Sequence, residues 1–438
     1  MEHSISRRQL LVDGGKAVIG AGISGSLLAA CGGSSGSSSS NSGPITLQYW
    51  VLGYQPHGSN QTGTLTDAAI AAFIKKHPNI KVNVTGYTGD QAGFTKITQA
   101  VQSGGSTVDV FRLPSDLLAL LIKQNLVAPI DDFLTADDKK DIFPQLLETV
   151  AHNGKHYSWP LWVPPVGMYL NLDIFAERKV TPPTDDWTYD DFVKIAQQLT
   201  FTRSNGQKIY GYTSVIDPGV VNSWPIIMGD GALPLSKDNT KYTFNTPEGI
   251  TGLQKLVDLA QKYKVTPPDF GTQSVTDIAT GFSQTKTYAM YSEPSGSSAG
   301  YRAMKLNFDV RAMPIGATGK HVTTGGIGLI AVSASIQDQG RLQAAMELAR
   351  YLTSKEVGDD VKGYYLAPGA RQSVQVSDPI NKFVPFVPYT YITPIIPQWP
   401  EIRTILHSQL QKAILGKISA TNALNGPASE INSLLSNS

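Results

Sequence analysis

Residues 45–87 decide the fold and read ITLQYWVLGYQPHGSNQTGTLTDAAIAAFIKKHPNIKVNVTGY. The first seven residues are rich in β-formers and lie between a proline and a glycine, which predicts a strand. Residues 65–78 carry apolar side chains at helical spacing and end at a proline, so they predict a helix. Residues 79–87 then alternate between apolar and polar, as a second strand does. A strand, a helix and a strand in this order indicate an α/β fold with a mainly parallel sheet, covered on both faces.

The same alternation continues through the rest of the chain. Residues 108–114 read VDVFRLP and predict a third strand, and residues 115–126 begin with a Ser-Asp cap and predict a helix. Three prolines within residues 153–171 exclude a regular helix there. Further helices are expected at 94–105, 189–200, 247–264, 341–354, 400–416 and 420–435, and strands at 286–294, 308–314 and 325–334. The chain is therefore α/β throughout.

Length and composition narrow the class of protein. A chain of 438 residues is longer than one core usually serves, so two lobes are expected. It carries 36 Lys and Arg against 35 Asp and Glu, and this balance argues against nucleic acid, which is bound through clustered cations. The single cysteine excludes an intramolecular disulfide framework.

The N-terminus is typical of an export signal. Residues 4–11 read SISRRQLL and precede a weakly apolar run that ends at Cys31. This run holds too few strongly apolar residues for a permanent membrane span. SRRQLL resembles a twin-arginine signal, and LLAAC resembles the lipobox of bacterial lipoproteins, in which the cysteine is lipidated. We therefore expect residues 1–30 to be an export signal and residues 31–43 to be a lipidated cysteine with a flexible tether.

The order of landmarks in the body resembles the extracellular solute-binding proteins of ABC importers, in particular sugar-binding family 1. The resemblance extends from about Ile45 to Leu435. The stretches that carry it are FIKKHPNIKV, NGKHYSWP followed by MYLNLDIF, PPTDDWTYDDFVKIAQQL, FSQTKTYAMYSEPSG, AMPIG with GGIGLIAVSA, and LQKAILGKISATNAL. The chain departs from the family pattern where Val108 stands before Asp109, where Thr285 replaces a glycine, and where no tryptophan follows AMYSEPSG.

This resemblance implies a periplasmic-binding-protein fold, with two α/β lobes, three crossings between them and a central ligand cleft. The crossings are expected near residues 162–165, 308–312 and 352–356. The N-terminal lobe would then comprise residues 45–162 and 310–354, and the C-terminal lobe residues 163–309 and 355–438. Closure of the lobes around a ligand would be a hinge motion that the importer recognises.

A carbohydrate site needs aromatic rings against sugar faces, and charged or amide groups at the hydroxyls. Clefts of open sheets lie at the carboxyl ends of their strands. The ligand-binding candidates are four tryptophans, four charged residues and two glycines whose backbone N–H groups could approach a ligand: Trp50, Trp162, Trp224, Trp399, Arg112, Asp116, Glu293, Arg371, Gly325 and Gly326. For each of them a role in the core, in a turn or at a helix cap stays open.

We thus expect a lipid-anchored binding protein on the outer face of the cytoplasmic membrane. It would capture a mono- or oligosaccharide and deliver it to the permease of an ABC importer as a monomer, without catalysis, cofactor, metal or nucleic acid. The alternatives are a polyol or glycerophosphodiester ligand, and presentation of the ligand to a sensor kinase. A more remote alternative is a secreted hydrolase, because GSSAG at residues 296–300 matches G-x-S-x-G with Ser298 as nucleophile and His407 downstream.

Overall fold

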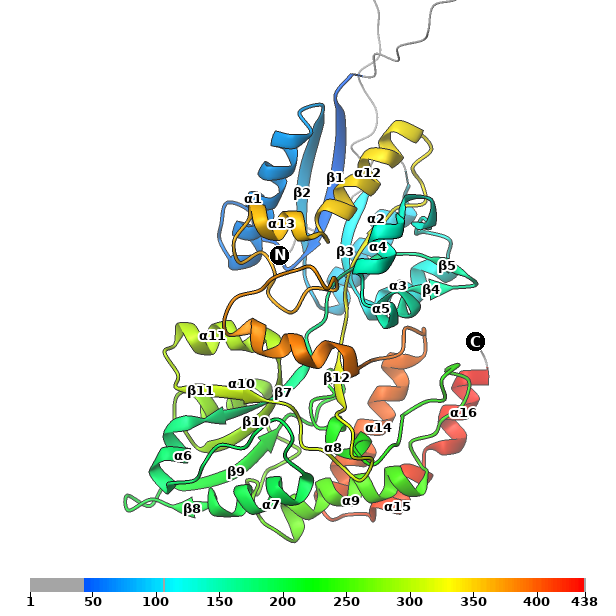
Figure 1. The fold of residues 1–438 in the computed structure, drawn as a ribbon. Coiled ribbons are helices and arrows are strands. Elements are labelled where there is room, and N and C mark those ends of the chain that lie inside the picture. The colour runs from blue at the N-terminus through cyan, green and yellow to red at the C-terminus, as the bar shows by residue number, and fades with distance from the viewer. Residues whose placement is uncertain (1–42, 105–106, 437–438) are drawn as a thin grey trace, which may run out of the picture. The chain divides into compact units, whose positions relative to one another are not determined.

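The computed structural model describes residues 43–104 and 107–436. The expectations for residues 1–42, which include the export signal and Cys31, lie outside the described residues. The body divides into two lobes, each built on its own five-stranded sheet (Figure 1).

The first lobe has the strand order β2-β1-β3-β13-β6. β1 is parallel to β2 and β3, whereas β13 is antiparallel to β3 and β6. Its elements are β1 (Ile45–Leu52), α1 (Gln61–Lys76), β2 (Ile80–Tyr87), α2 (Gln91–Gln102), β3 (Val110–Pro114), α3 (Ser115–Lys123), η1 (Asp131–Phe133), α4 (Ala136–Asp141), α5 (Pro144–Thr149), β4 (Ala151–His152), β5 (Lys155–His156), β6 (Trp159–Trp162), β13 (Gly328–Val332), α12 (Gln339–Tyr351) and α13 (Lys355–Asp360).

The second lobe has the strand order β11-β7-β10-β9-β8. Its elements are β7 (Val166–Asn171), α6 (Leu172–Arg178), α7 (Tyr189–Gln198), β8 (Phe201–Thr202), β9 (Lys208–Ser214), α8 (Trp224–Met228), α9 (Pro247–Gln261), α10 (Val275–Ser283), β10 (Tyr288–Pro294), η2 (Ser295–Ser297), α11 (Ser298–Ala303) and β11 (Phe308–Arg311). β12 (Thr323–Gly325) pairs with β14 (Thr390–Ile392), and η3 (Ile380–Tyr389), α14 (Trp399–Ile414), α15 (Ala420–Asn425) and α16 (Ala428–Ser436) complete the chain.

The α/β class is confirmed, but the sheets are less parallel than predicted. Parallel pairing joins β1 to β2 and β3, as expected from residues 45–114, and it joins β10 to β9. The other neighbours within the two five-stranded sheets are antiparallel, including β7 with both β10 and β11. β7 and β13 each follow a crossing from the other lobe, and each runs antiparallel to a neighbour in its sheet. The periodicity of a strand does not indicate in which direction the strand runs in the sheet.

Each lobe has its own apolar core, and the chain passes between the cores at three places. At the first passage, Val163 belongs to the first core and Val166 to the second. At the second passage, Val322 packs against the second core and Ile327 lies in the first.

At two of the three places, the chain crosses between the lobes at other residues than expected. The expected boundary at residue 310 lies inside β11, where Val310 pairs with Tyr169 of the second sheet. Residues from 355 onward were expected in the C-terminal lobe, yet Val357 and Val374 are buried in the first core. The third passage follows them, before Phe383, which is buried in an aromatic cluster of the second lobe. Helix α13 and the turn after it cover the first sheet, and their sequence does not indicate which lobe they cover.

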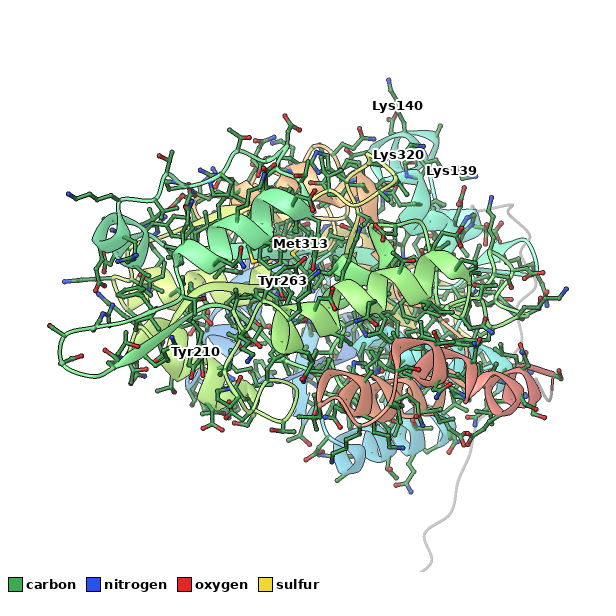
Figure 2. The ribbon with its side chains drawn as sticks, turned by 90° about the horizontal axis from the view of Figure 1, so that it is seen from below. Lys139, Lys140, Tyr210, Tyr263, Met313 and Lys320 are labelled. Atoms are coloured by element: carbon green, nitrogen blue, oxygen red, sulfur yellow. The ribbon has the colours of Figure 1, made fainter. Side chains whose placement is uncertain are left out.

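Charged side chains of the body extend outward from the ribbon in the view of Figure 2. Lys139 and Lys140 of α4 are both exposed there. Among the helices of residues 43–104 and 107–436, none is both long and apolar enough to cross a membrane.

Candidate functional site

The first part of the candidate site is an arginine stacked on a tryptophan. Arg112 lies near the end of β3, and its guanidinium carbon is 4.2 Å from the ring centre of Trp162 at the end of β6. Strand β13 runs between these two strands, with Ile330 opposite Arg112 and Gly328 opposite Trp162. Arg112 therefore reaches over β13 to the indole, and both side chains are half-buried.

Gly328 makes this stack possible. A Cβ atom at this position would lie 2.3 Å from Nε1 of Trp162, which no side chain tolerates. Because Gly328 has no side chain, the indole of Trp162 can lie against the backbone of β13. The guanidinium of Arg112 lies over the same indole. Gly328 stands in the GGIGLIAV stretch, which the sequence predicts as a buried strand, and no pattern there distinguishes it as a site residue.

The surroundings of Arg112 are aromatic. The hydroxyl of Tyr87 donates a hydrogen bond of 2.5 Å to the carbonyl oxygen of Arg112. Burial lowers the pKa of the Arg112 guanidinium, and the nearby phenols of Tyr49, Tyr364 and Tyr87 partly oppose this effect. No hydrogen bond or ion pair from the guanidinium reaches any described residue. Its donors are therefore available to a ligand.

The second lobe contributes a buried carboxyl group. Glu293 stands near the end of β10, only 8% exposed. Its carboxylate accepts hydrogen bonds from Nδ2 of Asn222 at 3.2 Å and from Oγ of Ser297 at 2.6 Å. Burial raises the pKa of Glu293, and no cation among the described residues pairs with it. Asn222 was absent from the sequence candidates because a lone asparagine before a short helix has no distinguishing pattern.

Backbone contacts bring this carboxyl group to the first crossing. The N–H of Ser295 donates to the carbonyl oxygen of Pro165 at 3.0 Å, and Pro165 forms an isolated bridge with Gly325. A Cβ atom on Gly325 would lie 2.8 Å from Cγ2 of Thr390, whereas one on Gly326 would have no atom within 4 Å. Gly325 thus permits close packing of the crossings, and Gly326 borders open space.

An ion pair joins the two lobes near the same place. Nη2 of Arg403, on α14, is 3.2 Å from Oδ2 of Asp116 in the first turn of α3. The side chains are 15% and 27% exposed. Asp116 was a sequence candidate, but its partner was not, because Arg403 occupies an ordinary position of an amphipathic helix.

Three sequence candidates are buried within a lobe and lie apart from the stack of Arg112 on Trp162. Trp224 and Trp399 are 0% exposed in the second core, where their rings are 5.9 Å apart. Arg371 is 4% exposed and pairs with Asp138 at 2.8 Å in the first lobe. The sequence does not distinguish these residues from ligand-binding ones, because tryptophan and arginine occur both in buried cores and in ligand sites.

Trp50 also lies away from the stack. Its Nε1 donates to the carbonyl oxygen of Thr107, which precedes β3, at 3.1 Å. Nζ of Lys96, on α2, lies 5.4 Å from its ring centre. The indole therefore faces α2 and the start of β3, whereas Arg112 lies near the end of β3.

The hydrolase alternative lacks its catalytic geometry. Oγ of Ser298 is fully buried and donates to the carbonyl oxygen of Ser295 at 2.6 Å. His407 is stacked on Trp224 in the second core, and its Nδ1 is 2.8 Å from the carbonyl oxygen of Arg403. Ser298 and His407 are thus bonded to other groups and form no nucleophile–base pair. Within the described residues there is also no group of three or more His, Cys, Asp or Glu side chains that could hold a metal ion.

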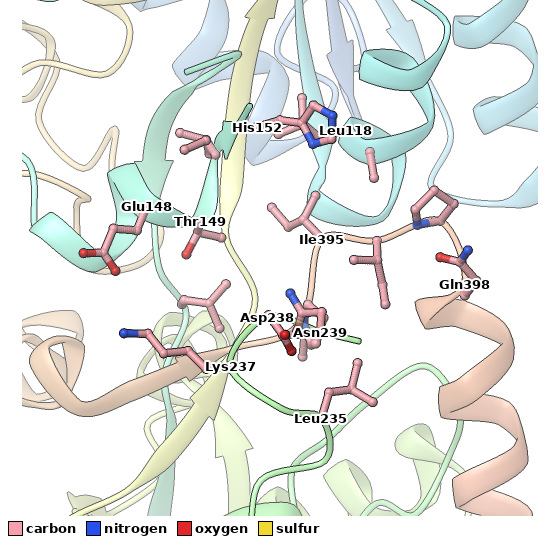
Figure 3. A pocket seen from close by; sticks show the side chains of 18 of the residues that line it. Leu118, Glu148, Thr149, His152, Leu235, Lys237, Asp238, Asn239, Ile395 and Gln398 are labelled. Carbon is pink, nitrogen blue, oxygen red and sulfur yellow. The ribbon is translucent and has the colours of Figure 1, made fainter. Parts of the chain in front are cut away.

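A cavity of about 890 Å³, here called the α3–α5 cavity, is lined by residues of both lobes (Figure 3). Leu118 and Ile122 of α3 and Thr149 of α5 line it from the first lobe. Lys237 and Ile395 line it from the second lobe. Its walls are mainly apolar, and none of the ten sequence candidates belongs to them.

Known proteins are similar to this chain over most of its length. A family model described as bacterial extracellular solute-binding protein matches residues 58–359. An uncharacterised ABC transporter extracellular-binding protein of Pyrococcus horikoshii is 29% identical over 162 residues, 36% of this chain. That match spans about a third of the length of the relative, 34%.

Two further comparisons cover nearly the whole chain. A galactooligosaccharide-binding protein of Bacillus subtilis is 26% identical over 428 residues, 92% of each protein. The solved structure of a cyclic alpha-maltosyl-1,6-maltose binding protein from Arthrobacter globiformis has a TM-score of 0.74 at 19% identity, covering 90% of this chain and 100% of that one. This structural likeness shows the two-lobed fold. The family model covers more than half of the chain, and the protein belongs to the bacterial extracellular solute-binding protein family.

Proposed function

We propose that this protein captures a carbohydrate between its two lobes and delivers it to an ABC importer without changing it chemically. The observation that carries the proposal is the half-buried stack of Arg112 on Trp162, whose guanidinium donors bind no described residue. Relatives whose names specify galactooligosaccharide and cyclic maltosyl-maltose binding support a sugar as the ligand class. The relative that is named for an ABC transporter supports import as the context.

The chemistry of the site suits a sugar. An indole offers an apolar face to the C–H groups of a pyranose ring, while a guanidinium donates to hydroxyls at its edge. Asn222 and Glu293 would supply an amide and a carboxyl group from the second lobe. Because these groups belong to two lobes linked at the crossings, a ligand that contacts both would favour the closed arrangement.

The test is a thermal-shift screen with the purified full chain carrying Cys31→Ser. The screen uses mono- and oligosaccharides, polyols and glycerophosphodiesters. A ligand at 100 times its dissociation constant stabilises the folded state by about 2.7 kcal/mol, which this measurement detects. A sugar should raise the melting temperature, and Trp162→Ala should reduce the rise at the same ligand concentration. Lys237→Ala, at the α3–α5 cavity, is the control and should leave it intact. A rise with phosphodiesters alone would contradict the sugar assignment, and chemical turnover of any sugar would contradict a purely binding role.

We also propose that the protein is exported and anchored by a lipid on Cys31. The support is the order of twin arginines, apolar run, LLAAC and serine-rich tether in residues 4–43. A flexible tether of about a dozen residues reaches roughly 20 Å from the membrane surface. Cys31→Ser should move the protein from the membrane fraction to the soluble fraction. An unchanged membrane fraction would contradict the anchor.

A further inference from the structure

Arg112 differs from every other arginine that the structure describes. Nine arginines lie in residues 43–104 and 107–436. Eight of them donate a side-chain hydrogen bond to a carboxylate or a backbone carbonyl: Arg178, Arg203, Arg302, Arg311, Arg341, Arg350, Arg371 and Arg403. Arg112 alone has no such bond to a described residue. Each of the other guanidinium groups donates at least one hydrogen bond to a described residue, although Nη2 of Arg371 and Nε of Arg403 have no partner, whereas the guanidinium of Arg112 donates none.

No carboxylate of the described chain is placed to neutralise Arg112. The groups that influence its charge are phenols, namely those of Tyr49, Tyr87 and Tyr364. Asp116, four residues further along, is paired with Arg403. Glu293, in the second lobe, accepts from Asn222 and Ser297, and no contact joins it to Arg112. A half-buried cation without a counter-ion is unfavourable, so its presence in the ligand-free chain needs a reason other than stability.

The contact with Trp162 leaves the N–H donors of the Arg112 guanidinium available to a ligand. The guanidinium carbon of Arg112 lies over the indole of Trp162, 4.2 Å from the ring centre. The N–H donors point outward in the plane of the group, in a fork that matches the two oxygens of a carboxylate or phosphate. The stack therefore holds the fork in a fixed orientation before any ligand arrives.

We propose that the ligand of this protein carries an anionic oxygen group, a carboxylate or a phosphate, and that Arg112 binds it. This inference rests on the proposed carbohydrate-binding function and specifies its substrate class as acidic sugars: uronates or sugar phosphates. Arg112 is then the residue that determines specificity for the charge, while Trp162 holds the guanidinium fork in place.

The first test needs no ligand. Arg112→Met keeps an apolar chain on Trp162 and removes the unpaired charge, so the melting temperature of the ligand-free protein should stay level or rise. The matched control is Arg178→Met, because Arg178 also lies over an aromatic ring, 4.7 Å from the centre of Phe201, but donates to the carbonyl oxygen of Gln198. Arg178 is exposed, so the control should melt close to wild type. If Arg112→Met melts clearly below both wild type and the control, Arg112 is structural and the proposal fails.

The second test compares matched sugars by calorimetric titration of the full chain carrying Cys31→Ser. The sets are glucose, glucuronate and glucose 1-phosphate, and galactose, galacturonate and galactose 1-phosphate. In at least one set an anionic member should bind about tenfold or more tighter than its neutral counterpart, as a charge-assisted pair does. Arg112→Met should remove this preference and Arg178→Met should keep it. The uronate and phosphate arms identify which anion is recognised.

The possible failures are distinguishable. If neutral sugars bind as tightly as their charged counterparts, the anion inference is wrong and the carbohydrate function stands. If Arg112→Met still prefers anionic sugars over neutral ones, another group binds the anion and the proposal is also overturned. If no sugar of either kind binds, the proposed function itself is contradicted, and the inference falls with it.

Discussion

The tryptophans of the body occupy two kinds of environment, and this difference decides what each can do. Trp159, Trp224 and Trp399 are 0% exposed and Trp187 is 3% exposed, whereas Trp50 and Trp162 are half-buried. A fully buried indole contributes to the core by its area, and a half-buried one keeps a surface for a ligand. Among them, only Trp162 lies against Arg112.

Trp162→Ala should weaken sugar binding by about 1 kcal/mol, roughly fivefold, because a stacked aromatic ring contributes about that much. Calorimetric titration measures the affinity, and thermal melting checks the fold. Trp50→Ala is the control: it removes a half-buried indole that faces α2, and the affinity should not change. If Trp50→Ala loses affinity instead, the ligand binds on the face of the first sheet that carries α2, and the site at Arg112 is contradicted.

Trp224→Ala should lower the free energy of unfolding by about 3 to 5 kcal/mol, as large-to-small changes in cores do. Its ring lies 5.2 Å from Phe244 and 5.4 Å from His407, so the deletion leaves a large cavity. Denaturant unfolding measures the change. A Trp224 variant of normal stability that has lost its ligand would restore the role that the sequence assigned to this residue.

At the scale of an element, β13 positions the site because Gly328 has no side chain that would collide with Trp162. Gly328→Ala should displace the indole of Trp162, because the new Cβ would lie 2.3 Å from Nε1. Since the indole supports Arg112, we expect weaker ligand binding with a modest loss of stability. The control is Gly326→Ala, two residues away, where no atom lies within 4 Å of the added carbon. Calorimetric titration of both variants gives the comparison, and equal affinities would show that the stack is not needed.

Helix α4 explains why Arg371 is structural. Asp138 caps this helix with Thr135 and also accepts from Arg350 and Arg371. Burial by itself raises the pKa of Asp138, but the bonds from Thr135 and the charge of Arg371 outweigh it, so the pKa lies below its ordinary value of 3.8. A carboxyl group whose pKa is lowered by folding stabilises the fold above its unfolded pKa, and this contribution is lost as the pH falls through the folded value.

The expected result is a steep fall of the melting temperature below about pH 4, where an unfolded aspartate begins to bind protons. Asp138→Asn should flatten this part of the profile and lower stability at neutral pH. Asp137→Asn, on the exposed side of the same helix, should leave the profile as it is. Melting curves between pH 2.5 and 7 test this, and an unchanged profile for Asp138→Asn would contradict the role of the pair.

At the scale of the whole molecule, Asp116 and Arg403 form the salt bridge that joins the two lobes within the described residues. Asp116→Asn should shift the ligand-free protein towards separated lobes and weaken ligand binding, because closure would then lose one favourable contact. Small-angle scattering should report a larger radius of gyration. The exchange variant Asp116→Arg with Arg403→Asp should restore the compact form.

The control for this pair is Asp359→Asn, which breaks an exposed ion pair with Lys355 inside α13. It should change neither the radius of gyration nor the affinity, since exposed pairs within one helix contribute little. An Asp116 variant that scatters like wild type would show that the ion pair does not influence the lobes.

The α/β class and the two lobes could be predicted from the sequence alone, because they depend on local periodicity and chain length. Residues 45–126 illustrate this, since every predicted strand and helix there is present. The α/β alternation, the solute-binding resemblance and the candidates Arg112, Trp162 and Glu293 all came from such local patterns.

Only the tertiary structure decided which candidates meet and which are buried. Trp162 and Trp224 look alike in sequence, yet one lies half-exposed against Arg112 and the other lies in a core with Trp399. Partners such as Arg403, Asn222 and Gly328 come from segments far apart in the chain. The physical reason is that burial and pairing depend on long-range contacts, whereas the periodicity of a sequence records only what each element needs locally.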